Sequence, residues 1–151
     1  MKTARGRSIE HAFVLAAALA APLVLLAFGL WLAPDARGYG THQKLGLPPC
    51  LMMEWFHVPC PGCGVTTSVA LAAHGRILDS ARNQPFGLLV ALAIPAVAAW
   101  AVAGHLRGRD LYQDLNRMRL RPWIWWVAAA LAVSWVYKLA LVLAPRFGLK
   151  G

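Results

Sequence analysis

Three long hydrophobic runs divide the chain, at about residues 11–32, 85–103 and 122–144. Each run comes close to the roughly 20 residues with which an α-helix crosses a hydrocarbon core of about 30 Å. Pro85 opens the second run, where proline suits the first turn of a helix. The pattern therefore predicts three transmembrane helices.

A shorter apolar run, at about residues 65–74, predicts a helix that cannot cross. About ten residues span only about 15 Å, so this helix is expected to lie at the interface or to enter the membrane part way. Thr66, Thr67 and Ser68 suit its first turn as caps. The remaining expectations are an interfacial turn at 51–56, a polar loop at 75–84, and a surface helix at 110–121 with the apolar stripe Leu111, Leu115 and Met118.

The composition supports a membrane environment. Hydrophobic residues make up 59% of the 151 residues and charged residues 14%, whereas soluble domains average about 45–50% and about 25%. We therefore expect an all-α integral membrane protein, one membrane domain over residues 1–151, with three transmembrane helices and one short interfacial or half-inserted helix. A cleaved signal peptide is the alternative for the first run, but that run exceeds the usual core of about 7–15 residues.

The positive charges predict the orientation in the membrane. Basic residues gather before the first run and in the loop 104–121, and short loops rich in Arg and Lys face the cytoplasm. The N-terminus and that loop are therefore expected inside, on the cytoplasmic side of the membrane, and the segment 34–84 outside. The net charge of +9 is attributed to topology and not to nucleic-acid binding. Anionic lipids are expected to contact Arg107, Arg109, Arg117, Arg119 and Arg121.

Two of the three cysteines lie in one turn-forming motif, His57-Val58-Pro59-Cys60-Pro61-Gly62-Cys63-Gly64. Proline and glycine suit the central positions of a β-turn, with glycine permitting positive φ, so the two sulfurs are brought within reach of each other. A helix that begins near Val65 would direct its positive end at Cys63, which would lower the pKa of that thiol.

Three uses of the cysteines follow. In the first, a structural disulfide joins Cys50 to Cys60 or Cys63 and fixes the outer loop. In the second, Cys60 and Cys63 are a catalytic redox pair, with Cys50 as a resolving thiol. In the third, Cys50, Cys60 and Cys63 bind zinc or a similar ion, with His57 or His42 as the fourth ligand. No other cofactor is expected.

The motif resembles a known bacterial family, domain-of-unknown-function family 2752. The family's Cys-Pro-x-Cys-Gly-x-Thr core corresponds to residues 60–66, its upstream cysteine to Cys50, and the resemblance extends over about Cys50 to Gly104. This chain departs from the family at Thr67, where arginine is common, and at Gln84-Pro85, where Asn-Pro is common. The resemblance implies a small multi-pass membrane protein and no particular reaction.

Lys138 is the one basic residue well inside a predicted span. We expect its side chain to reach the outer headgroups, and the alternative is an ion pair with Asp79 or Glu54. No catalytic triad, nucleotide-binding loop or paired-carboxylate site is visible in the sequence. The sequence thus predicts a structural, binding or assembly module with an outer cysteine motif, bound to the lipid bilayer and able to meet a membrane-protein partner or a second copy. A thiol–disulfide oxidoreductase is the alternative.

Overall fold

The computed structural model of the chain describes residues 9–118 and 120–143. These residues form helices joined by loops, without a strand. The helices are α1 (Ile9–Trp31), the 3₁₀ helix η1 (Thr41–Leu45), α2 (Leu51–Trp55), α3 (Val65–Ala73), α4 (Ile77–Asn83), α5 (Pro85–Leu106), α6 (Leu111–Arg117) and α7 (Leu120–Leu143).

The expectation of an all-α membrane protein is confirmed. Three helices of the described residues, α1, α5 and α7, are long and apolar enough to cross a bilayer. Only 6%, 22% and 11% of their most apolar windows are buried inside the protein, so lipid must cover the rest of their surface. The predicted boundaries agree with these helices within a few residues, except that Ala144 lies outside the described residues.

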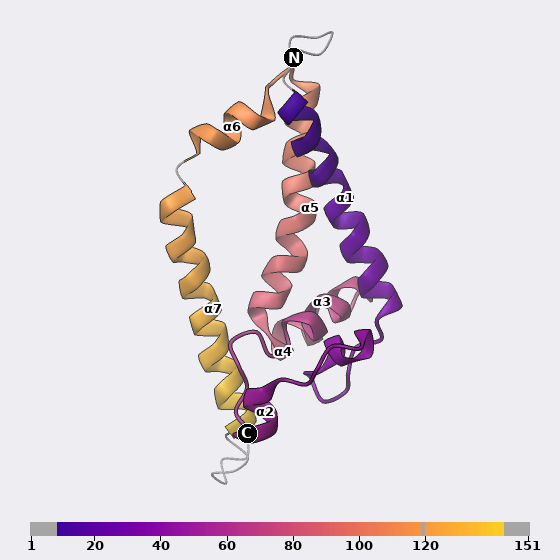
Figure 1. The fold of residues 1–151 in the computed structure, drawn as a ribbon, viewed down its shortest axis with the longest axis vertical. Coiled ribbons are helices and arrows are strands. Elements are labelled where there is room, and N and C mark those ends of the chain that lie inside the picture. The colour runs from indigo at the N-terminus through magenta and orange to yellow at the C-terminus, as the bar shows by residue number, and fades with distance from the viewer. Residues whose placement is uncertain (1–8, 119, 144–151) are drawn as a thin grey trace.

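The two ends of the molecule are built from different short helices (Figure 1). α1 and α5 run side by side, and α3 and α4 lie across them at one end, close to η1 and α2. α6 lies at the opposite end, beside the start of α1. α7 stands apart from α5 over much of its length and approaches the cysteine-containing end near its C-terminus. The chain therefore gathers its irregular segments, and all its cysteines, at one end of the three long helices.

The short helices at 65–84 differ from expectation in their second half. The predicted helix at 65–74 is confirmed as α3, but the expected polar loop at 75–84 contains the helix α4. Gly75, with φ of +75°, ends α3 and lets α4 fold back against it. Polar residues in this segment masked the helix, because its buried face carries Ser80 instead of an apolar stripe.

Close backbone packing joins the short helix to the second span. A Cβ added to Gly87 of α5 would lie 2.6 Å from the Ser68 Cβ and 2.9 Å from the Val65 carbonyl oxygen. Only glycine permits this approach. α5 therefore holds the first turn of α3, which directly follows the cysteine motif.

At the other end, a buried histidine pair ties α6 to the long helices. His11 Nδ1 accepts the Leu111 N–H at 2.9 Å, so the neutral ring carries its proton on Nε2, 3.1 Å from His105 Nδ1. Leu111, the first residue of the predicted apolar stripe, is fully buried. Leu115 is partly buried and Met118 is exposed.

We expect His11→Phe to destabilise the protein by about 1–3 kcal/mol, because it keeps a ring but leaves the buried Leu111 N–H without this acceptor. Thermal unfolding of the purified protein in detergent measures the change. Phe13→Leu, at a position where the side chain is exposed to lipid, is the control. A control loss as large as that of His11→Phe would contradict the assignment.

The basic loop contains one internal ion pair and several exposed arginines. Arg109 Nε pairs with Asp114 at 2.9 Å, whereas Arg107, Arg117 and Arg121 are exposed. Arg119 lies outside the described residues. Contact of these arginines with anionic lipid stays a prediction.

Candidate functional site

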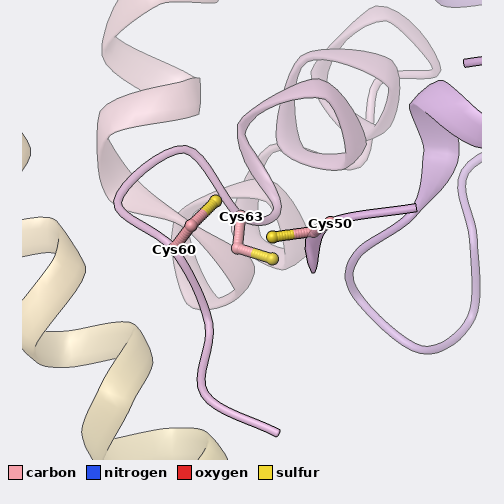
Figure 2. Close-up of side chains that lie close together, drawn as sticks. All are labelled: Cys50, Cys60 and Cys63. Carbon is pink, nitrogen blue, oxygen red and sulfur yellow. The ribbon is translucent and has the colours of Figure 1, made fainter. Parts of the chain in front are cut away.

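The three cysteines converge on one point at the end of the helices (Figure 2). The Sγ atoms of Cys50, Cys60 and Cys63 all lie within 4.8 Å of one another, although Cys50 precedes Cys60 by a loop and the whole of α2. Cys50 is the residue before α2, and Cys63 lies just before α3. Cys63 is buried, the other two are partly buried, and all three are free thiols.

A β-turn presents two of the sulfurs, as the sequence predicts. The Cys63 N–H donates to the Cys60 carbonyl oxygen at 2.9 Å across Pro61 and Gly62. The expected positive φ falls elsewhere, however: Gly62 does not adopt it, and Gly64 does, with φ of +91°. The turn itself therefore contains no left-handed residue, and the left-handed residue is the N-cap of α3.

Gly64 lies against a buried polar network that the sequence did not reveal. Asn83 Nδ2, at the end of α4, donates to the Gly64 carbonyl oxygen at 3.1 Å and to Ser68 Oγ at 2.9 Å. On the other side, Lys138 Nζ donates to Asn83 Oδ1 at 2.7 Å, to the Asn83 carbonyl oxygen at 3.2 Å and to the Gly38 carbonyl oxygen at 3.1 Å. Asn83 thus joins the cysteine motif to α7.

Both expectations for Lys138 are wrong. Its side chain is 5% exposed, so it does not reach the headgroups, and none of its hydrogen bonds goes to Asp79 or Glu54. The long stem instead turns inward, where carbonyl oxygens from the loop at Gly38 and from the end of α4 supply the acceptors that lipid lacks. Lys138 is therefore part of the motif's support.

Other buried polar contacts hold the motif from each neighbouring element. Ser68 and Ser80 exchange hydrogen bonds between their hydroxyls and each other's carbonyl oxygens, at 3.1 and 2.7 Å. Thr67 is buried and meets Thr41 at 2.7 Å between hydroxyl oxygens. Thr67 and Ser68 are thus internal connectors and not the helix caps that the sequence suggested, since α3 has no side-chain cap.

The segment before the turn is also fixed. The indole of Trp135 in α7 donates to the Pro59 carbonyl oxygen at 2.8 Å, and Pro59 is fully buried. Gln84 Nε2 lies 3.4 Å from the Pro61 carbonyl oxygen, and Gln84 is fully buried too. α7 and the junction between α4 and α5 therefore both hold this small loop.

The thiol pKa values follow an order opposite to the expected one. Burial and the neighbouring Cys60 and Cys50 raise the pKa of Cys63 to about 12. Burial also raises the pKa of Cys60. Burial acts against ionisation of Cys50 as well, but the Met53 backbone amide and the Cys60 thiol outweigh it and lower the pKa of Cys50. The start of α2, and not that of α3, therefore stabilises the thiolate.

This order predicts which thiol reacts first. In the reduced, metal-free protein, Cys50 should be alkylated at lower pH than Cys60 and Cys63, because only its pKa is lowered. Cys63 should react last at every pH, because it is buried as well. Timed alkylation followed by peptide mass spectrometry measures this order. Earliest labelling of Cys63 would contradict it.

The two histidines predicted as possible fourth ligands lie in different positions relative to the cysteines. His57 is exposed and does not belong to the cysteine group, and it adopts a positive φ of 55°. His42 instead lines a cleft of about 230 Å³ together with Cys50, Cys63 and Glu54. The cleft also gives the cluster access to solvent, and its remaining lining is Arg37, Tyr39, Gly40, Gln43, Pro49 and Met53.

Sequence reasoning missed the supporting residues of the site. Asn83 and the buried Gln84 fall within the predicted polar loop at 75–84, and Trp135 falls within a predicted span, so the sequence assigns none of them to the site. A signal was present in α7, where Ser134, Trp135 and Lys138 are polar residues in an otherwise apolar helix and share one face at i, i+1 and i+4. Ser134 Oγ accepts the Phe86 N–H at 3.0 Å, so this face docks on the motif end of the molecule.

Comparison with known proteins gives one result. No curated protein and no solved structure matches the chain. The resemblance drawn from the cysteine motif is confirmed, because residues 50–99, which begin at the first cysteine and end within α5, match the family described as "Protein of unknown function (DUF2752)".

Proposed function

We propose that this protein is a membrane-anchored binding module whose cysteine cluster holds a thiophilic divalent metal ion such as Zn²⁺. The observation that carries the proposal is the convergence of all three sulfurs within 4.8 Å. A disulfide needs two sulfurs, so it gives no reason for the third to lie beside them.

The spacing of the sulfurs suits a metal. A Zn–S bond of about 2.3 Å at a tetrahedral angle separates neighbouring sulfurs by about 3.8 Å. The cluster, with separations of up to 4.8 Å, would contract by no more than about 1 Å to bind the ion. Three thiolates and a fourth position open to water or an imidazole are an ordinary zinc ligand set.

The cleft beside the cluster supports this use. His42 and Glu54 line it with Cys50 and Cys63, so a nitrogen, a carboxylate or water is available as the fourth ligand. Metal binding would also fix the loop before α2 to the turn before α3, which is the structural role considered from the sequence. The module would thereby present a rigid outer loop to a membrane partner.

A Co²⁺ titration of the full chain in detergent tests the proposal. Co²⁺ bound by thiolates gives intense sulfur-to-metal charge-transfer absorption, which Zn²⁺ displaces without absorbing. We expect one equivalent of Co²⁺ for the natural protein and strongly weakened binding for Cys50→Ser, Cys60→Ser and Cys63→Ser. His57→Ala is the matched control and should bind normally. Absence of thiolate bands in the reduced natural protein would overturn the proposal.

A second candidate, thiol–disulfide exchange, rests on the lowered pKa of Cys50 beside Cys60. The Cys50 thiolate would attack a disulfide of a partner protein and form a mixed disulfide, releasing one partner thiolate. Cys60 would then attack Cys50, forming the Cys50–Cys60 disulfide and releasing the second partner thiolate. Cys50 and Cys60 are oxidised, the partner disulfide is reduced, and the two thiol protons pass to the partner. This reaction does not require Cys63, so retention of exchange activity in Cys63→Ser would favour it over the metal site.

The proposed location is the cytoplasmic membrane of a bacterium, with the cysteine cluster outside. α6, which belongs to the Arg-rich loop, and the start of α1 lie at the end opposite the cluster, and positive charge marks the cytoplasmic side. A membrane-impermeant thiol reagent should label the metal-free protein in intact cells at Cys50. Labelling only after lysis would reverse the orientation.

A further inference from the structure

We propose that Lys138 is the counter-charge of the metal centre and makes the site selective for divalent ions. This inference rests on the metal site proposed above. It starts from an ammonium group buried in α7 that has hydrogen-bond acceptors but, among the described residues, no carboxylate partner.

The surroundings of Lys138 satisfy its hydrogen bonds without neutralising its charge. Its three bonds go to the carbonyl oxygens of Gly38 and Asn83 and to the amide oxygen of Asn83, all of them neutral groups. Among the residues that the structure describes, the ion pairs join arginines to aspartates, and Lys138 takes part in none of them. A buried charge without an opposite charge is unfavourable.

The cysteine cluster can supply negative charge beside Lys138. A Cβ on Gly64, the residue after Cys63, would lie 3.3 Å from Lys138 Nζ, which places the ammonium directly beside the motif. An ionised Cys63 would interact electrostatically with the Lys138 ammonium. A thiolate at Cys63 would therefore lie within the field of the ammonium.

The net charge of the site predicts which class of ion binds. With water or an imidazole as the fourth ligand, three thiolates and one divalent cation have a net charge of −1, which a single ammonium neutralises. With a monovalent cation the site would have −2, and with a trivalent ion it would be neutral before Lys138 is counted. In a part-buried site of low dielectric, a difference of one unit of net charge changes the binding free energy strongly. Lys138 thus favours divalent ions.

Two probes separate charge from fold. The first is Co²⁺, whose complex with three thiolates is anionic. The second is arsenous acid, As(OH)₃, which reacts with three thiols to give a neutral tris-thiolate and three water molecules, with no oxidation or reduction. Any variant that merely disorders the cluster weakens both probes, whereas a variant that removes only the charge weakens Co²⁺ alone.

The experiment compares the natural protein with Lys138→Gln, Lys138→Arg and Tyr137→Phe, using the full chain in detergent. Gln keeps a donor but loses the charge, Arg keeps the charge, and Tyr137→Phe removes a neighbouring bond from α7 to the Arg82 carbonyl oxygen. We expect Lys138→Gln to bind Co²⁺ at least roughly tenfold more weakly. Lys138→Arg should restore most of the affinity, Tyr137→Phe should leave it unchanged, and arsenic should bind all four proteins alike.

Two results would overturn the inference while leaving the metal site in place. One is unchanged Co²⁺ affinity in Lys138→Gln, and the other is an equal loss of arsenic and Co²⁺, which would make Lys138 a structural residue. Failure of the natural protein to bind Co²⁺ while arsenic still binds would instead overturn the metal function itself, and the counter-charge with it.

Discussion

Gly64→Ala is expected to destabilise the protein by about 2–6 kcal/mol and to remove metal binding, because both the backbone and the space forbid a side chain there. The residue has φ of +91°, which costs a non-glycine residue about 1–3 kcal/mol. An added Cβ would also lie 2.8 Å from the Gly38 carbonyl oxygen and 3.3 Å from both Asn83 Nδ2 and Lys138 Nζ. Thermal unfolding in detergent and Co²⁺ titration measure the two effects.

Gly62→Ala is the matched control within the same motif. A Cβ at Gly62 would meet no heavy atom within 4 Å, and its φ is not positive. We expect a change in stability within about 0.5 kcal/mol and normal metal binding. If the two alanine variants behaved alike, the geometry of the motif described above would be wrong.

Asn83→Leu is expected to destabilise the protein by about 3–5 kcal/mol, the range seen when one partner of a buried charge is removed. The substitution removes the Asn83 amide oxygen, which accepts from Lys138 at 2.7 Å. It also removes the Asn83 amide nitrogen, which donates to the Gly64 carbonyl oxygen and to Ser68 Oγ. α4, α7 and the motif should lose their common anchor. Unfolding temperature, together with proteolysis of the loop before α3, reports the loss.

Two neighbouring variants make this test specific. Asn83→Asp keeps an acceptor for Lys138 but removes the donors to Gly64 and Ser68, so it should fall between the natural protein and Asn83→Leu. Arg82→Gln alters the adjacent exposed side chain and should change stability by no more than about 0.5 kcal/mol. Equal behaviour of Arg82→Gln and Asn83→Leu would refute the anchoring role.

The lengths of the hydrophobic runs in the sequence predicted most of the fold. The three spans and α3 follow from runs of apolar residues whose extent sets what can cross a bilayer, and this property is local in sequence. α4 escaped prediction because its buried face is made of hydroxyl and amide groups. Such groups are as common in loops, so they carry no periodic signal.

The cysteines could be predicted to act together, but their support could not. Turn chemistry places Cys60 beside Cys63, whereas the position of Cys50 depends on η1 and α2 folding back on the turn. The role of Lys138 depends on contacts with Gly38 and Asn83, which are 100 and 55 residues away in sequence. The Lys138 side chain is long enough to reach the headgroups, and only its contacts in the folded chain turn it inward.

X-ray absorption at the zinc edge, on the full-length protein loaded with one equivalent of Zn²⁺, tests the metal site most directly. The three converging sulfurs predict three sulfur scatterers at about 2.3 Å and one nitrogen or oxygen. Cys50→Ser should reduce the sulfur count by one. A spectrum fitted by nitrogen and oxygen alone, or one that Cys50→Ser leaves unchanged, would contradict a site built from Cys50, Cys60 and Cys63.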